Sequence, residues 1–189
     1  MTTRLRAELQ AIIRADPDLM RLLELLRRLD LPEGRLVAGA IYQTVWNVLC
    51  GSPRGTGIRD YDVIYFDDAD LSYEAEDAVI RRVAAGGDFK APIETRNQAR
   101  VHLWYEQRFG APHPRLASAD EALGFYANTA HAVGVRLEPD GRLDLIAPFG
   151  LGDIFEMIMR RNPACPASTA YGEKARRARA IWPRLRVVD

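Results

Sequence analysis

Cysteine is scarce in this sequence, which has only two, Cys50 and Cys165, among 189 residues. Neither has a Cys or His neighbour at the spacing of a zinc ligand set, and two residues make no disulfide framework. We therefore expect no structural zinc. Both cysteines are expected to be reduced, small hydrophobic groups in or near the core of a cytoplasmic protein.

An excess of charge is also missing, because 26 Lys and Arg balance 26 Asp and Glu. Without a global field, the chain has no general attraction to nucleic acid or to an anionic membrane. A polyanion must therefore be bound by a local cluster. No apolar run approaches the ~18 residues of a membrane helix, and the charges in MTTRLRAELQ argue against a signal peptide.

Hydrophobic periodicity predicts one α/β domain over residues 1–189, with a mixed β-sheet flanked by helices. We divide it into N-terminal helices (1–30), an α/β core (35–147) and C-terminal helices (151–189). Strands are predicted at 35–38, 58–66, 91–95, 133–137 and 142–147. After the N-terminal pair, helices are predicted at 41–49, 73–85, 97–109, 118–130, 151–161 and 169–181. Asp16 before Pro17, Ser72 and Ser118 are predicted to cap the amino-terminal ends of three of the predicted helices.

Two carboxylates, Asp60 and Asp62, stand two residues apart on the predicted strand 58–66. Side chains two apart on a strand point to the same face, so the two negative charges repel each other unless a cation lies between them. Hard oxygen ligands of this kind suit Mg²⁺ or Mn²⁺, with phosphate oxygens completing the shell. The alternative is a polar strand end with both acids in solvent.

Longer stretches carry a resemblance to a known family. They are Leu36 to Ser72, which contains VAGAIYQTVWNVLC and GIRDYDVIYFDDADLS, then IETRNQARVHLWYEQRFG, APFGLGDIFEMIMRRNP and the closing Tyr171, Lys174 and Trp182-Pro183. The chain resembles a family of uncharacterised bacterial nucleotidyltransferase-like proteins, within the polymerase-beta-like superfamily. The resemblance covers most of the chain beyond the N-terminal helices and implies a nucleotidyltransferase fold.

The resemblance also implies roles for single residues. Asp60 and Asp62 would bind the catalytic metal, and Gly39 with Ala40 would form the turn that the nucleotide triphosphate approaches. A third carboxylate normally comes from a neighbouring strand; Glu94 is the best match and Asp144 the next. The chain departs from the superfamily in having Ala40 where Ser is usual, and in a longer gap between the glycine and the acids.

A cationic run surrounds Glu94. Arg96 and Arg100 would neutralise phosphate charge next to the metal, although Glu94 could instead form an ordinary ion pair with either of them. Trp104 and Tyr105 are interpreted as core residues, since aromatic residues at helical spacing usually pack inward. The basic residues Lys174, Arg176, Arg177 and Arg179 of the last helix are interpreted as a solvated face.

These features lead to the hypothesis of a metal-dependent nucleotidyltransferase. It would move a nucleoside monophosphate (NMP) group from a nucleoside triphosphate (NTP) to a hydroxyl of an acceptor, with Glu94 activating that hydroxyl. The acceptor could be a small molecule, a protein or RNA. Two alternatives remain at this stage: a non-catalytic nucleotide-binding module, favoured by Ala40, and a metal-dependent phosphohydrolase using the same acids. One sequence does not indicate an oligomeric state.

Overall fold

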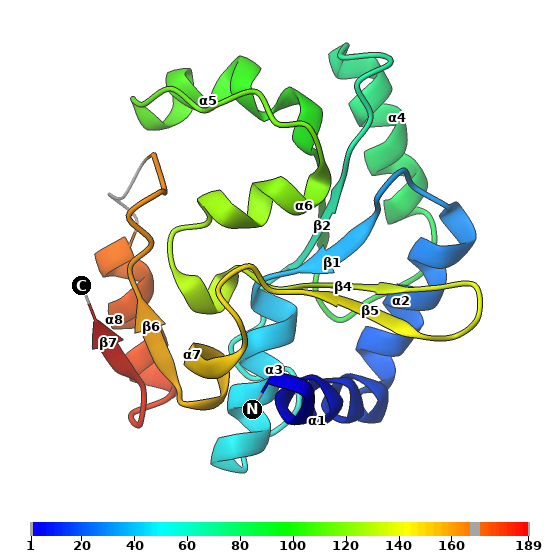
Figure 1. The fold of residues 1–189 in the computed structure, drawn as a ribbon. Helices are drawn as coiled ribbons and strands as arrows, with labels where there is room; N and C mark the ends of the chain where they lie inside the picture. Colours follow the sequence, from blue (N-terminus) through cyan, green and yellow to red (C-terminus); the bar gives the residue numbers. More distant parts are fainter. Residues whose placement is uncertain (1, 167–170, 189) are drawn as a thin grey trace.

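The apolar segments of the predicted core pair into a five-stranded sheet in the computed structural model, which describes residues 2–166 and 171–188 (Figure 1). Its order is β3-β2-β1-β4-β5. The strands are β1 (Arg35–Val37), β2 (Tyr61–Tyr65), β3 (Ile93–Asn97), β4 (Gly134–Leu137) and β5 (Leu143–Ile146). The β2–β3 pair is parallel and the other pairs are antiparallel, so the predicted mixed sheet is confirmed.

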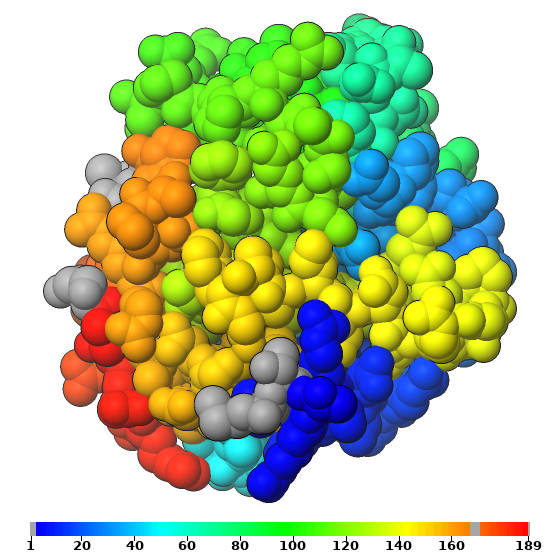
Figure 2. Space-filling view, in the orientation of Figure 1, coloured from blue at the N-terminus to red at the C-terminus, as the bar shows by residue number. Residues whose placement is uncertain are grey.

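The helices of the amino-terminal half pack in the larger core, against one face of the sheet. They are α1 (Thr2–Ala15), α2 (Pro17–Leu29), α3 (Gly39–Cys50) and α4 (Tyr73–Ala84). The predicted caps are confirmed: the Asp16 side chain accepts hydrogen bonds from two backbone N–H groups of α2, and Ser72 accepts one from α4. In Figure 2, α1 lies against the β4–β5 hairpin, where Arg6 donates to the Leu145 carbonyl.

The opposite face carries shorter elements and a smaller core. They are η1 (Gln98–Arg100), α5 (Val101–Phe109), α6 (Ala119–Ala122), η2 (Leu123–Phe125) and η3 (Thr129–His131). Ser118 caps α6 as predicted, but a continuous helix over 118–130 is wrong. The chain becomes 3₁₀ at Leu123 and extended at Tyr126.

The C-terminal region differs most from the prediction. It contains α7 (Gly152–Phe155), β6 (Ile158–Arg160), α8 (Tyr171–Ile181) and β7 (Arg186–Val188), and β6 pairs with β7 in parallel. A helix over 151–161 is wrong because Met157 has a φ of 53°, which an α-helix does not accommodate. Of the predicted helix 169–181, residues 169–170 lie outside the described residues.

Within the described residues, none of the helices has the length and apolar character needed to cross a bilayer.

Candidate active site

Two carboxylates lie side by side on the sheet because of its register. Asp62 on β2 pairs with Glu94 on the parallel strand β3, and paired residues on adjacent strands point to the same face about 5 Å apart. The strand begins only at Tyr61, so Asp60 precedes it rather than belonging to it as predicted. All three acids nevertheless line one cavity.

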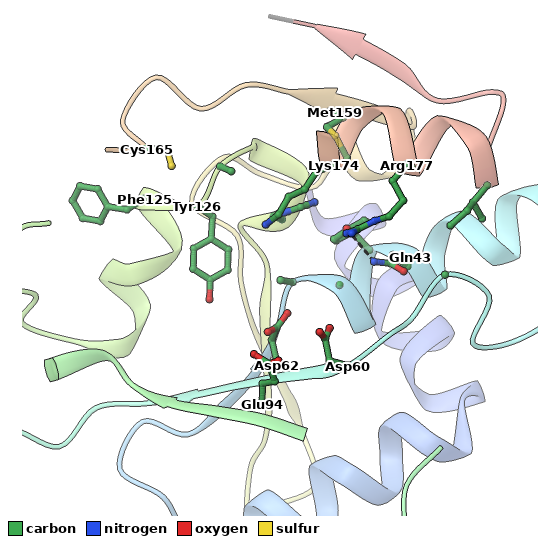
Figure 3. Close-up of a pocket in the computed structure, with 18 of the residues that line it drawn as sticks. Gln43, Asp60, Asp62, Glu94, Phe125, Tyr126, Met159, Cys165, Lys174 and Arg177 are labelled. Carbon is green, nitrogen blue, oxygen red and sulfur yellow. Dashed lines mark hydrogen bonds between the residues drawn. The ribbon is translucent and has the colours of Figure 1, made fainter. Parts of the chain in front are cut away.

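This cavity, which we call the acidic cavity, has a volume of about 440 Å³. Asp60, Asp62 and Glu94 point into it from the sheet, and Lys174 and Arg177 of α8 lie across from them (Figure 3). The basic side chains on one wall attract the anionic groups of a ligand. The acidic side chains on the facing wall attract cations that such a ligand brings with it.

Burial and crowding act strongly on Asp62. Loss of solvent, with the charges of Asp60 and Glu94, raises the pKa of its carboxyl from 3.8 to about 6, although Lys174 and Arg96 partly offset this. A raised pKa means that the charged form is destabilised where it stands. A cation bound to these oxygens would remove that destabilisation.

The three acids do not form a ready-made metal cage. Within residues 2–166 and 171–188, no group of three or more His, Cys, Asp or Glu side chains is placed to hold a metal ion. Mg²⁺, however, is usually bound by one or two carboxylates, with water and substrate phosphates completing its ligands. Asp62 and Asp60 could therefore hold a magnesium ion that is shared with a nucleotide.

The amino-terminal end of α3 opens into the same cavity through Ala38 and Gly39. The first N–H groups of a helix have no partner within it, and the methyl side chain of Ala38 cannot accept a hydrogen bond from them. Ala38 also adopts a φ of 53° and ψ of −118°, a conformation that favours glycine. Free N–H groups and the helix dipole together make this end suitable for phosphate.

Ala40, the second residue of the predicted turn, does not line the cavity as Gly39 does. Its side chain is fully buried in the larger core. Only its backbone N–H, in the first turn of α3, is available to an anion. The Ser that is usual at this position in the superfamily would therefore have to place its hydroxyl in an apolar environment here.

A stacked pair forms another wall. Tyr42 and His131 lie nearly parallel, with ring centroids 4.5 Å apart. Burial, followed by the charges of Lys174 and Arg177, lowers the pKa of His131 well below its ordinary range, so the ring is neutral at pH 7. His131 Nε2 and Gln43 Oε1 are buried without a hydrogen-bond partner in the described part of the chain, and both residues line the acidic cavity.

The loop between α3 and β2 is fixed in place rather than free. The side chain of Asn47 donates to the Thr56 carbonyl and accepts from the Trp182 indole. Gly57, with a φ of 81°, lies so close to Trp182 that an added Cβ would be 2.4 Å from the indole ring. The long gap between Gly39 and Asp60 is therefore an ordered segment that brings Asp60 to the cavity.

Two predicted site residues lie elsewhere. Arg100 is buried, forms an ion pair with Glu76 and donates to the Leu71 carbonyl, and it does not line the acidic cavity. Asp144 on β5 forms an ion pair with Arg35 on β1, 2.8 Å from its guanidinium, and does not line the acidic cavity. Asp144 as the third carboxylate is therefore wrong, and Arg100 is not placed to reach a phosphate at this site.

Glu94 and Arg96 both lie on β3, next to the strand that carries Asp62. Among the described residues Glu94 forms no ion pair, so the predicted alternative of a bond to Arg96 or Arg100 does not occur. Arg96 lies two pairs further along β3 than Glu94, opposite Ile64. It lines an adjoining cavity rather than the acidic one.

Sequence reasoning missed the cations Lys174 and Arg177, and it missed His131. The interpretation of the last helix as a solvated face is wrong for Lys174, which is half-buried at the cavity. A signal was present, since Tyr171, Ala175 and Ala178 form the buried stripe of α8, and Lys174 and Arg177 adjoin it. His131 has no local signal, because its partner Tyr42 is distant in sequence.

Comparisons with known proteins agree with this geometry. A family model described as nucleotidyltransferase matches residues 24–187. A solved structure that reveals a CCA-adding enzyme head domain superimposes with a TM-score of 0.79 at 26% identity, covering 95% of each chain. A CCA-adding enzyme in complex with CTP matches at a TM-score of 0.54 and 17% identity, over 96% of this chain and 43% of the other.

A search of curated proteins gave no significant match. The head-domain match confirms the predicted nucleotidyltransferase-like α/β fold. With the family model spanning most of the sequence, the chain belongs to the nucleotidyltransferase family.

Proposed function

We propose that this protein transfers an NMP group from an NTP to a hydroxyl of an acceptor, in a reaction that depends on Mg²⁺ or Mn²⁺. The observation that carries the proposal is the pairing of Asp62 with Glu94 in a cavity whose opposite wall holds Lys174 and Arg177. Family membership supports nucleotidyl transfer in general.

The triphosphate binds between the amino-terminal end of α3 and α8. The free N–H groups beyond Ala38, with Lys174 and Arg177, neutralise its β- and γ-phosphates. Because these groups are fixed before the reaction, they also stabilise the charge that develops on the pyrophosphate as it leaves.

The acids lie at the α-phosphate. Asp60 and Asp62 would hold Mg²⁺, which supplies charge neutralisation at the phosphate oxygens. Glu94 accepts the proton of the acceptor hydroxyl, whose oxygen forms a bond to the α-phosphorus. The bond from that phosphorus to the bridging oxygen of the β-phosphate breaks, and pyrophosphate leaves.

The acidic cavity also accounts for the absence of the usual Ser. In this chain the phosphate contacts come from backbone N–H groups and from α8, so Ala40 does not by itself favour a non-catalytic module. CTP is the first NTP to test, because a solved structure with this fold contains it.

The test is an incubation with α-labelled CTP, Mg²⁺ and a cell extract, divided into a small-molecule fraction and an RNA fraction. Pyrophosphate release with label transferred to an acceptor is expected, and Asp62→Asn should reduce it at least 100-fold. The exposed Asp68→Asn is the matched control and should retain activity. Orthophosphate release would indicate the phosphohydrolase, and CTP binding without any release would indicate the module.

A further inference from the structure

A second cavity adjoins the first, on the same face of the sheet. It has a volume of about 290 Å³ and shares two acids and four rings with the acidic cavity, Asp62, Glu94, Tyr105, Phe109, Phe125 and Tyr126, whereas Trp104 and His113 line it alone. Its other walls are largely aromatic, and we call it the aromatic cavity. Its rings come from α5, from η2 and from the segments beside them: Trp104, Tyr105, Phe109, His113, Phe125 and Tyr126.

These rings form a continuous series. Tyr105 lies 4.6 Å from Phe109 and 4.7 Å from His113, and His113 lies 5.2 Å from Phe125, measured between ring centroids. Trp104 extends the series from Tyr105 at 6.1 Å. Such distances are those of interacting aromatic pairs.

The aromatic residues of α5 do not fill a core, contrary to the sequence interpretation. Val101 is the buried residue of this helix, whereas Trp104 and Tyr105 are half-buried and Phe109 is 40% exposed. A helix that carries three aromatic residues would normally bury them against its neighbour. Here they surround an opening, which is the arrangement of a binding site for an apolar ligand.

Charge separates the two cavities. The cations Lys174 and Arg177 line the acidic cavity but not the aromatic one, and of the described residues around the aromatic cavity only Arg96 is a Lys or Arg. Asp62 and Glu94 add negative charge to its lining, and away from the proposed divalent ion they repel a phosphodiester chain. A polyanion is therefore disfavoured, and a neutral ligand is favoured.

We propose that the aromatic cavity holds the acceptor, and that the acceptor is a small neutral molecule with an aromatic ring and a hydroxyl-bearing arm. The ring lies among Trp104, Tyr105 and Phe125, and the arm reaches Glu94 and Asp62. The volume suits one ring system with its substituents, since it falls at the lower end of small-molecule sites. The inference rests on the proposed nucleotidyl transfer, because it assigns the second substrate of that reaction.

The test uses benzyl alcohol as a probe, with its binding followed by ligand-observed NMR. We expect binding in the millimolar range, with transferred contacts to the Trp104 indole protons, and at least 10-fold weaker binding to Trp104→Ala. Trp104→Phe should restore binding. Leu103→Ala changes an exposed neighbour on α5 that does not line the cavity, and it should bind the probe as the unchanged protein does.

Glycerol and a single-stranded RNA oligonucleotide with a free 3′ hydroxyl serve as competitors. Neither should displace the probe. The proposal is overturned if benzyl alcohol does not bind, if it binds without contacts to Trp104, or if the RNA displaces it. Mg²⁺-dependent CTP binding, measured on the same unchanged protein without the probe, reports separately on the proposed transferase site, so the two failures are distinguishable.

Discussion

Asp62 shows how a single residue can serve a site at the expense of stability. In the folded chain its pKa is about 6, above the ordinary 3.8 that an unfolded chain retains. Above pH 6 the carboxylate is charged in both states and its burial opposes folding. As the pH falls from 6 to 4 the folded state takes up a proton, and that opposition disappears.

Asp62→Asn should therefore stabilise the metal-free protein while it abolishes transfer. At pH 7.5 we expect a gain of about 1–2 kcal/mol, after allowance for partial exposure, or several degrees in Tm. At pH 4.5 the gain should nearly vanish. Thermal unfolding in EDTA at both pH values measures this, with Asp68→Asn as control. An equal gain at both pH values would contradict the assigned burial of the charge.

Lys174 gives a second prediction at this scale. Lys174→Ala should weaken Mg²⁺-dependent CTP binding about 10- to 100-fold, because a charge-assisted bond to phosphate is lost. Arg176→Ala changes an exposed cation on the same helix that does not line the cavity, and should have little effect. Titration calorimetry of CTP with Mg²⁺ on both variants measures the two affinities. If Arg176→Ala weakens binding as much as Lys174→Ala, CTP binding depends on the total positive charge of α8, and the specific role of Lys174 is contradicted.

The acids of the site could be predicted from the sequence, and the cations could not, for a physical reason. Asp60 and Asp62 are two residues apart, so short-range geometry indicates that pair. Glu94 was expected only from the family resemblance, which implies a third carboxylate on a neighbouring strand, and the structure pairs it with Asp62. Lys174 and Arg177 reach the cavity only through the packing of α8. Arg100 looked equally suitable, but its charge is neutralised by Glu76, 24 residues earlier in the sequence.

Among the elements, the loop from α3 to β2 determines where Asp60 lies. Gly57 and Gly55 both adopt positive φ, 81° and 80°, but only Gly57 lies against another side chain, that of Trp182. The two glycines therefore separate the effect of backbone strain from that of steric contact. Backbone strain alone costs about 1 kcal/mol at such a position.

We expect Gly57→Ala to cost about 2 kcal/mol more in the free energy of unfolding than Gly55→Ala, because its Cβ would displace the indole. Gly57→Ala should also weaken Mg²⁺-dependent CTP binding, since Asp60 is three residues away. Urea unfolding and calorimetry test both parts. Equal unfolding free energies for the two variants would mean that the loop yields without moving Trp182.

Helix ends with a strong local signal were predicted well. Asp16 with Pro17, Ser72 and Ser118 all cap helices as expected, because a cap is a contact within three residues. The strands β6 and β7 were missed. Each has three residues, and they pair across a separation of 28 positions, Ile158 with Arg186, so neither has a periodicity to detect.

At the scale of the molecule, the site is assembled from distant parts of the chain. The acids come from β2, from the segment that enters it and from β3, the free N–H groups from α3, and the cations from α8. Residues of α5 and η2 line both cavities, and the aromatic cavity adds Trp104 and His113 next to the same acids. In the proposed reaction, the sheet would hold the two substrates in adjoining cavities next to one pair of carboxylates, as transfer between them requires.

The central claim is that the acids bind a nucleotide together with a divalent ion. Titration calorimetry of CTP with and without Mg²⁺, on the unchanged protein and on Asp62→Asn, tests it most directly. We predict binding that requires Mg²⁺ and weakens at least 10-fold in the variant. Equal CTP affinity with and without Mg²⁺, or in the protein and its variant, would contradict the account.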